Sequence, residues 1–153
     1  MHNRHPFLTV VTFACASLLI ACIPDGSTGP RPSSALPLEG TTWVLTHLTG
    51  APVQQPPGPR RLFLRLDRQH GRVKGFGGCN TFYGAYTLDN GRIDISGLGG
   101  TRMHCPGRME LERRFLKALE WASGWSIQDG RLQLLDPDGV IVAELRPAPE
   151  ESG

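Results

Sequence analysis

The chain has 153 residues, a formal net charge of +2 at pH 7 and 39% hydrophobic residues. This length suits one modest hydrophobic core and is short for two. We do not expect nucleic-acid binding, because it would need a basic face with stacking aromatics in a cytoplasmic protein. The basic residues here alternate instead with strand-forming apolar ones. We expect a solvated strand face at the densest basic cluster, with contact to anionic lipid head groups as a second possibility. That cluster comprises Arg60, Arg61, Arg65, Arg68, Arg72 and Lys74.

The N-terminal segment has the pattern of a secretory signal. A short basic start precedes a mostly apolar run from Phe7 to Ala21, which polar residues interrupt and which is short for a membrane-spanning helix. The run ends in Leu19-Ile20-Ala21-Cys22, which resembles the lipobox of bacterial lipoproteins. We expect residues 1–21 to be a removed signal peptide and Cys22 to carry acyl chains such as palmitate. A plain signal peptide and an N-terminal anchor are the alternatives.

The residue after the lipidated cysteine bears on the membrane involved. An Asp at this position commonly signals retention in the inner membrane of bacteria, and Ile23 stands here instead. We therefore expect an outer-membrane anchor, with the domain facing the periplasm.

Composition divides the rest of the chain into a linker, a domain and a tail. Residues 22–38 are rich in Pro, Gly and Ser, which is typical of a flexible linker. Residues 39–146 contain short stretches of alternating apolar and polar residues between turn residues, and this pattern predicts strands. Residues 147–153 are expected to form a loose tail.

Strand and turn signals run through most of the domain. The stretch TWVLTHL places Trp43 and Leu45, followed by His47, on one face, and LFLRL at 62–66 is a second strand. The segment TGAPVQQPPGPR between them is expected to be an exposed loop, because prolines prevent regular pairing. Later, DNG at 89–91, DG at 129–130 and PDG at 137–139 predict tight turns, so the last three strands form a meander.

One segment has helical periodicity instead. In PGRMELERRFLKALEWASG, at 106–124, Leu111, Phe115 and Leu119 recur at helical spacing, and Gly124 is placed to end the helix. We expect this amphipathic helix to cover an open end or face of the sheet. Trp121 and Trp125 are expected to be buried, and the alternative is that one fills the core beneath the helix while the other lies exposed.

The glycine-rich stretch GFGGCNTFYGAY, at 75–86, is not expected to bind phosphate. A dinucleotide-binding loop needs a third glycine where Asn80 stands, and a helix must follow it so that helix amides meet the phosphate. Strands are predicted after Asn80 here.

Two cysteines, Cys79 and Cys105, remain in the expected domain. In an oxidising periplasm such a pair is most simply a disulfide, which would contribute roughly 3 to 4 kcal/mol to stability. A catalytic thiol would need a histidine base, and only the fold could bring His47 or His70 close. A zinc site from the cysteines with His104 and His70 is not supported by the spacing, so no metal or cofactor is expected.

Several motifs follow one another in order between residues 39 and 146. The most specific are Gly78-Cys79-Asn80 and Thr101-Arg102-Met103, the latter followed by His104-Cys105. Supporting motifs are Trp43-Val44-Leu45, Tyr83-Gly84-Ala85-Tyr86, Glu112 with Phe115 and Leu119, and LQLLDPDG at 132–139. In this order they resemble the META domain, also called the HslJ-like family.

The resemblance implies an α+β, β-rich fold, in which mainly antiparallel strands curl into a partly open, barrel-like sheet with one packed α-helix. It also implies that Cys105 lies near Cys79. Members are often bacterial envelope lipoproteins, some linked to heat stress or antibiotic tolerance, and no catalytic chemistry is established for them. The resemblance therefore supplies no catalytic residue.

Three functions are compatible with these patterns. The first is a non-enzymatic, membrane-anchored lipoprotein that supports envelope integrity and stress tolerance by binding an unknown envelope protein or cell-wall component. The second is a periplasmic inhibitor of cell-wall hydrolases such as lysozyme, with Ala51–Pro59 as the contact element. The third is a thiol-dependent enzyme or redox partner using Cys79 or Cys105.

Overall fold

The computed structural model describes residues 36–149, which contain nine strands and one helix. The expected signal peptide, Cys22, most of the expected linker and residues 150–153 lie outside this range. The strands are β1 (Thr42–Leu48), β2 (Ala51–Pro52), β3 (Phe63–Asp67), β4 (Arg72–Phe76), β5 (Thr81–Asp89), β6 (Arg92–Gly100), β7 (Gly124–Gln128), β8 (Arg131–Leu135) and β9 (Ile141–Pro147). The helix is α1 (Met109–Trp121).

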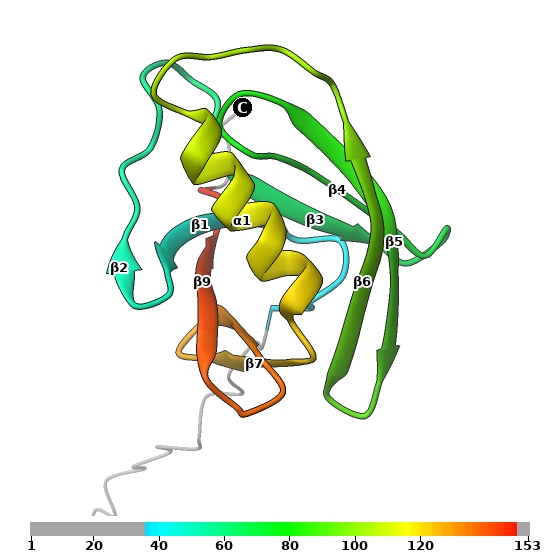
Figure 1. The fold of residues 1–153 in the computed structure, drawn as a ribbon. Helices are drawn as coiled ribbons and strands as arrows, with labels where there is room; N and C mark the ends of the chain where they lie inside the picture. The colour runs from blue at the N-terminus through cyan, green and yellow to red at the C-terminus, as the bar shows by residue number, and fades with distance from the viewer. Residues whose placement is uncertain (1–35, 150–153) are drawn as a thin grey trace, which may run out of the picture. The chain divides into compact units, whose positions relative to one another are not determined.

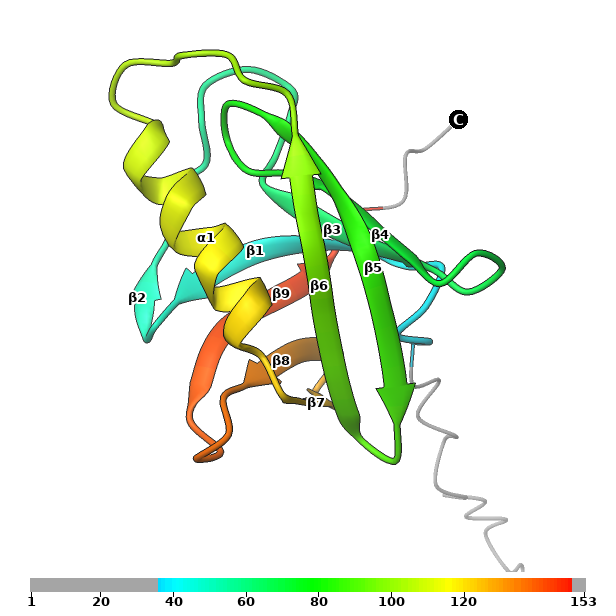
Figure 2. The ribbon, with the colours of Figure 1, turned by 45° about the vertical axis from the view of Figure 1, so that its right-hand side comes forward.

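All strand pairings are antiparallel, and the sheet curls until its ends meet. The order is β2-β1-β3-β4-β5-β6-β7-β8-β9, and β9 pairs again with β1. The ring is least continuous between β6 and β7, where Arg92 opposite Gly124 is the one pair of residues in register. Beyond this pair β6 diverges from the last three strands (Figures 1 and 2). The fold is therefore the partly open, barrel-like sheet with one helix that the resemblance implied.

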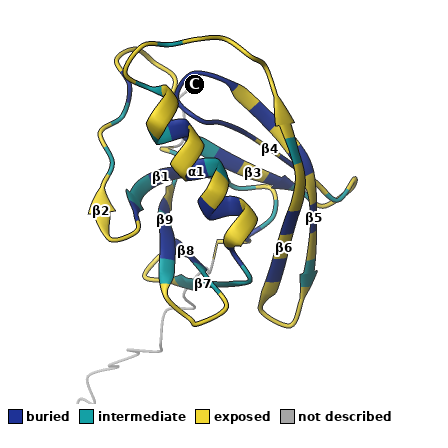
Figure 3. Cartoon of the chain, viewed as in Figure 1, coloured by how far each residue is buried: buried dark blue, intermediate teal, exposed yellow. Residues whose placement is uncertain are grey.

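The helix covers the opening that this divergence leaves. In Figures 1 and 2, α1 lies between the β1–β2 hairpin and β6. Its buried face contains Phe115, Ala118 and Leu119, in agreement with the predicted stripe. The Phe115 ring meets the ring of Phe82 from β5 edge-on, with 5.9 Å between centroids. Helix and sheet thus enclose one core, seen as the dark blue inner positions in Figure 3.

The tight turns follow the local sequence. Asn90 and Gly91 both have positive φ, as do Asp129 and Gly130. This conformation matches the right-handed twist of the strands it joins and is tolerated by Asn, Asp and Gly. Both hairpins were predicted from these dipeptides, and β7, β8 and β9 form the expected meander.

The first strand differs from simple alternation. Trp43 and Leu45 are fully buried as predicted, but the register with β9 shifts between Leu45 and His47. The bulge at Thr46 turns Leu48 into the core in place of His47, which is only partly buried. A β-bulge reverses the facing of every residue after it, so the prediction for His47 was wrong.

Three boundary features also differ from expectation. Leu38 is buried, and its carbonyl accepts a 2.9 Å hydrogen bond from the Trp43 indole, so the core begins just before residue 39. The helix ends at Trp121, and Gly124 begins β7 instead of capping the helix. Trp121 is 56% exposed and Trp125 is partly buried against the core, so burial of both was wrong and the alternative with one exposed tryptophan holds.

Within residues 36–149, no helix is both long enough and apolar enough to span a membrane.

Candidate functional site

A buried carboxylate lies at the centre of the expected motif residues. Glu112 of α1 is 6% exposed. One of its oxygens, Oε2, accepts hydrogen bonds from the backbone N–H groups of Cys79 (3.1 Å) and Asn80 (2.6 Å). The other, Oε1, accepts one from the Asn80 side-chain amide at 2.7 Å. A buried carboxylate is costly unless such donors surround it, and these three donors fix the loop against the helix.

The Asn80 side chain connects this carboxylate to the second motif. Its Oδ1 accepts hydrogen bonds from the Thr101 hydroxyl (2.8 Å) and the Met103 N–H (2.7 Å). Its Nδ2 donates to the Met103 carbonyl at 3.1 Å as well as to Glu112. An asparagine amide offers two donors and two acceptor sites, and all four are used. The orientation of the amide is fixed, because a carboxylate can only accept.

The disulfide closes the same cluster. Cys79 and Cys105 are bonded, with 5.7 Å between their Cα atoms, in keeping with the pairing favoured from the sequence. Neither sulfur is a free thiol in this state. Of the Thr-Arg-Met motif, Thr101 and Met103 hold the Asn80 side chain by hydrogen bonds. Arg102, between them, is exposed.

A glycine is required where the strand passes the carboxylate. A Cβ atom on Gly77 would lie 2.6 Å from Cγ of Glu112 and 2.8 Å from its Oε2. Gly78 has φ +113°, a conformation that other residues rarely adopt. The glycines therefore let the backbone wrap around Glu112. The amides that could have received an external phosphate are occupied by a carboxylate of the chain itself.

The proline-rich segment after β1 is more ordered than an exposed loop. Ala51–Pro52 pairs with β1, and the Val53 N–H donates to the Thr46 carbonyl at 2.8 Å. The Gln55 side-chain amide makes two hydrogen bonds to backbone groups of the kind that a neighbouring strand would make. It donates to the Leu45 carbonyl at 2.6 Å and accepts from the Leu62 N–H at 2.8 Å. The expectation of an exposed loop was wrong for Val53 and Gln55, which are partly buried, and for Pro56, which is buried. It holds for the side chains of Ala51, Pro52 and Gln54 and for residues 57–59.

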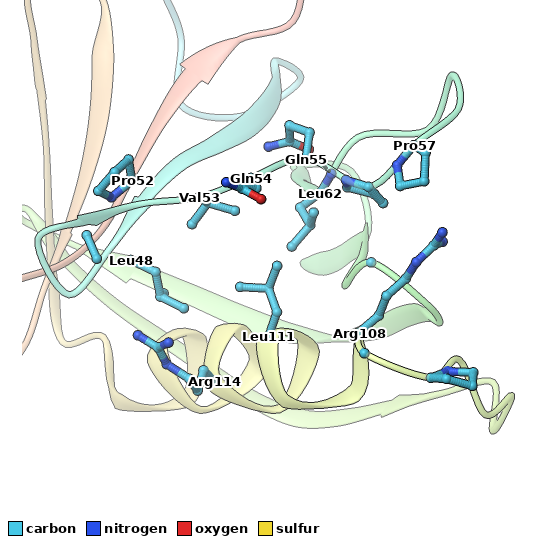
Figure 4. A pocket seen from close by; sticks show the side chains of 15 residues that line it. Leu48, Pro52, Val53, Gln54, Gln55, Pro57, Leu62, Arg108, Leu111 and Arg114 are labelled. Atoms are coloured by element: carbon cyan, nitrogen blue, oxygen red, sulfur yellow. Dashed lines mark hydrogen bonds between the residues drawn. The ribbon is translucent and has the colours of Figure 1, made fainter.

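An open groove of about 460 Å³ lies between this segment and α1. Leu111 points from α1 toward Val53 and Leu62 on the opposite wall (Figure 4). Arg108 and Arg114 lie along the helix side, and none of the groove-lining residues is acidic. Gly78, Pro106 and Gly107 also line the groove, and Gly78 and Pro106 are next to Cys79 and Cys105 in the sequence, so the disulfide cluster and the groove are contiguous.

The three histidines among residues 36–149 make local contacts or lie exposed. His70 hydrogen-bonds Asp67 at 2.8 Å on the surface, and this contact lowers the pKa of Asp67. His47 contacts the Thr46 hydroxyl at 3.2 Å, and His104 is exposed. Among residues 36–149 no group of three or more His, Cys, Asp or Glu side chains is placed to hold a metal ion.

A buried tyrosine lies at the other end of the barrel. The Tyr86 hydroxyl donates to Oε1 of Glu39, and Tyr86 is 6% exposed. Burial is the largest cause and this hydrogen bond the second largest of a rise in the pKa of Tyr86 far above the ordinary value of 10.0. The pair holds the entering chain against β5.

The family model described as META domain matches residues 36–148. This chain belongs to the META domain family. The match confirms the resemblance drawn from the Gly-Cys-Asn and Thr-Arg-Met motifs and encloses the expected domain at 39–146. No curated protein matches the chain.

Solved structures share the META-domain fold. An NMR structure of a protein from Burkholderia xenovorans is 28% identical, covers 73% of this chain and 84% of its own, and superposes with a TM-score of 0.57. A second NMR structure is 24% identical, with coverages of 71% and 90% and a TM-score of 0.55. A crystal structure of a DUF4847 family protein from Bacteroides vulgatus is 14% identical, with coverages of 71% and 93% and a TM-score of 0.50. The last two support the fold alone.

The roles of two site residues of the META domain were missed from the sequence. Glu112 was named with Phe115 and Leu119 among the family motifs, but its burial was not predicted, although the helical stripe that it shares with them could have indicated it. Gln55 carried no signal, because its two bonds depend on backbone groups of separate strands.

Proposed function

We propose that this protein is a non-enzymatic, lipid-anchored component of the bacterial cell envelope. Its META domain binds another envelope component and supports integrity under heat and antibiotic stress. The lipobox-like sequence ending at Cys22, the linker behind it and the family membership support this proposal. The groove between α1 and the proline-rich segment is the observation that carries the binding role.

The groove has the size and chemistry of a binding site. Ligand pockets are typically about 300 to 1,000 Å³, with an apolar lining and a few polar groups that orient the ligand. Here Leu62 and Leu111 supply apolar surface, and Arg108 and Arg114 supply positive charge without an acidic neighbour in the lining. This arrangement suits an apolar segment that carries a carboxylate or phosphate.

Both walls of the groove are held in place before any ligand binds. Gln55 ties the proline-rich wall to the sheet, and the disulfide with Glu112 fixes the loop beside the groove. Preorganised walls lower the entropy cost of binding.

Deletion of the gene followed by complementation tests this role. We expect deletion to increase sensitivity to heat, detergent and hydrophobic antibiotics, and the natural chain to restore survival. Arg114→Gln, in the groove, should restore it less well than Arg113→Gln, a neighbouring exposed position paired with Glu110 outside the groove. Unchanged survival of the deletion strain in all three conditions would remove the proposal.

The anchor is tested separately by fractionation. Cys22→Ala should move the protein from the outer-membrane fraction to the soluble periplasmic fraction after a high-salt wash. The natural chain should resist the same wash, because acyl chains anchor by apolar burial. Retention of Cys22→Ala in the washed membrane would contradict lipid attachment at this residue.

Inhibition of a cell-wall hydrolase is a second candidate. Its support is the exposed tip at residues 57–59, which follows the Gln55 tie and is held at a fixed base. Purified protein should then inhibit lysozyme, and a Pro57→Ala, Pro59→Ala variant should inhibit less. Full lysozyme activity at a micromolar excess of the protein rules this candidate out.

A further inference from the structure

Six cations gather on the outer surface of β3, β4 and their neighbours. On the chain leading into and along β3, Leu62, Leu64 and Leu66 point into the core, so the alternate positions face outward. All six side chains are exposed. We call this surface the basic face; it comprises Arg60, Arg61, Arg65, Arg72, Lys74 and Arg146.

Within the described residues no basic-face side chain forms an ion pair, although Asp67 lies opposite Arg72 and, besides the His70 hydrogen bond, the charge of Lys74 helps to lower the pKa of Asp67. The ion pairs found there are Arg68–Glu39, His70–Asp67 and Arg113–Glu110, and none includes a basic-face residue. Arg65 lies directly opposite Lys74 on the neighbouring strand. Like charges in this position destabilise a sheet, so folding alone does not account for the pair.

Aromatic rings lie among these cations. Arg60 lies over the Phe76 ring, with its guanidinium carbon 4.0 Å from the ring centre. Lys74 is opposite Tyr83 on β5, and Tyr83 is 55% exposed. Tyrosine beside lysine and arginine is the combination that suits the interface between a bilayer and water.

The chain enters the domain beside the same face. Pro37, Leu38 and Gly40 line one hollow together with Arg65 and Lys74. Glu39, Asp67 and Arg68 line the same hollow, so its basic residues outnumber its acidic ones by three to two. If lipid is attached at Cys22, residues 23–35 connect the bilayer to this entry point. If this linker is flexible, as its composition predicts, a chain of that length spans about 20 Å on average, and the anchor would hold the basic face within reach of the lipid head groups.

We propose that the basic face docks onto the anionic phospholipid surface to which the chain is anchored. This inference rests on the proposed anchor, which supplies the proximity. Phosphate groups of anionic head groups would relieve the repulsion between Arg65 and Lys74, and Tyr83 would lie at head-group level. Each cation near such a surface strengthens binding about fivefold.

Vesicle co-sedimentation tests the docking without the anchor. The probe is phosphatidylcholine vesicles with and without phosphatidylglycerol, and the protein is the unlipidated chain from Ile23 to Gly153, oxidised, which retains every described strand and the disulfide. We expect binding only to the anionic vesicles and loss of binding at high salt. Arg65→Gln with Lys74→Gln should weaken binding about 25-fold. The control Arg92→Gln with Arg131→Gln removes the same charge at two exposed strand positions elsewhere and should have a much smaller effect.

Three results would overturn the docking proposal. Equal binding to both kinds of vesicle would exclude recognition of anionic lipid, and equal loss in the two double variants would exclude a specific face. Binding that occurs only after residues 150–153 are deleted would assign the face to the acidic tail of the chain itself. Fractionation of Cys22→Ala after a high-salt wash reports on the anchor alone, so either proposal can fail without the other.

Discussion

The buried carboxylate of Glu112 makes the sharpest prediction about stability. In Glu112→Gln the side chain keeps its shape, but one of its two acceptor atoms becomes a donor. If the remaining oxygen faces the N–H groups of Cys79 and Asn80, the new amide faces the Asn80 amide, and two donors meet. Rotating the Asn80 amide gives no relief, because its oxygen would then face the Met103 carbonyl.

The cost depends on how many buried donors are left without an acceptor. One such donor costs about 1 to 3 kcal/mol, so we expect Glu112→Gln to lower the free energy of unfolding by that amount. Glu112→Ala leaves three donors without their acceptor and should cost more, about 3 to 5 kcal/mol. Small domains have about 5 to 15 kcal/mol in total, so the alanine variant approaches the limit of folding.

Equilibrium urea denaturation of the oxidised protein measures these differences. The matched control is Glu110→Gln, on the same helix, where the exposed carboxylate pairs with Arg113. The decrease in unfolding free energy for this control should not exceed about 0.5 kcal/mol, as for other exposed pairs. If Glu112→Gln is no less stable than Glu110→Gln, the carboxylate does not hold the Gly-Cys-Asn loop against the helix.

Three further predictions concern the same domain. Mass spectrometry of the chain from Ile23 should show no thiol labelling before reduction, and Cys79→Ser with Cys105→Ser should lose about 3 to 4 kcal/mol; labelling of the native protein would instead reopen the thiol-enzyme hypothesis. Gly77→Ala should lower the free energy of unfolding by about 1 to 3 kcal/mol, because the new Cβ would clash with Glu112. The control Gly124→Ala, whose nearest contact would be 3.7 Å, should leave that free energy nearly unchanged. Equal decreases for the two variants in urea denaturation would refute the close approach. Because the pKa of Tyr86 is raised in the folded state, the stability that Tyr86 contributes is complete below pH 10.0 and is lost as pH rises beyond it, since the unfolded tyrosine ionises first. Thermal denaturation at a series of alkaline pH values should therefore show a smaller loss of stability for Tyr86→Phe than for the natural protein. The same loss in both proteins would contradict the burial effect.

Local signals were sufficient for most of the fold. Asn90-Gly91 and Asp129-Gly130 fix their hairpins because the turn needs positive φ at adjacent residues. The Phe115–Leu119 stripe located the helix, since its period differs from that of the strands around it. Closure of β9 on β1 and the bulge at Thr46 could not be read from either segment, because both depend on pairing between the two ends of the domain.

The candidate site was predictable only in part, for a related reason. Proximity of Cys79 to Cys105 followed from compartment and from the family resemblance. The burial of Glu112 did not, because a glutamate in the first turn of a helix is ordinarily solvated and acts on the helix dipole. The donors that make its burial favourable, two backbone N–H groups and the Asn80 side-chain amide, come from a loop far away in the sequence.

The motif side chains are used in contacts within the cluster, and this explains why the family motif would say little about any ligand. The motif side chains of Asn80 and Thr101 are used in hydrogen bonds within the cluster, and Cys79 is used in the disulfide. What they present to the groove is backbone and glycine, whereas the side chains that a ligand would meet, such as Leu111 and Arg114, come from α1 outside the motif. A change at these helix positions can therefore alter binding while the scaffold stays intact. If the groove binds a ligand as proposed, the residues that set its specificity should be sought on the groove side of α1, by substitutions that leave the denaturation midpoint unchanged.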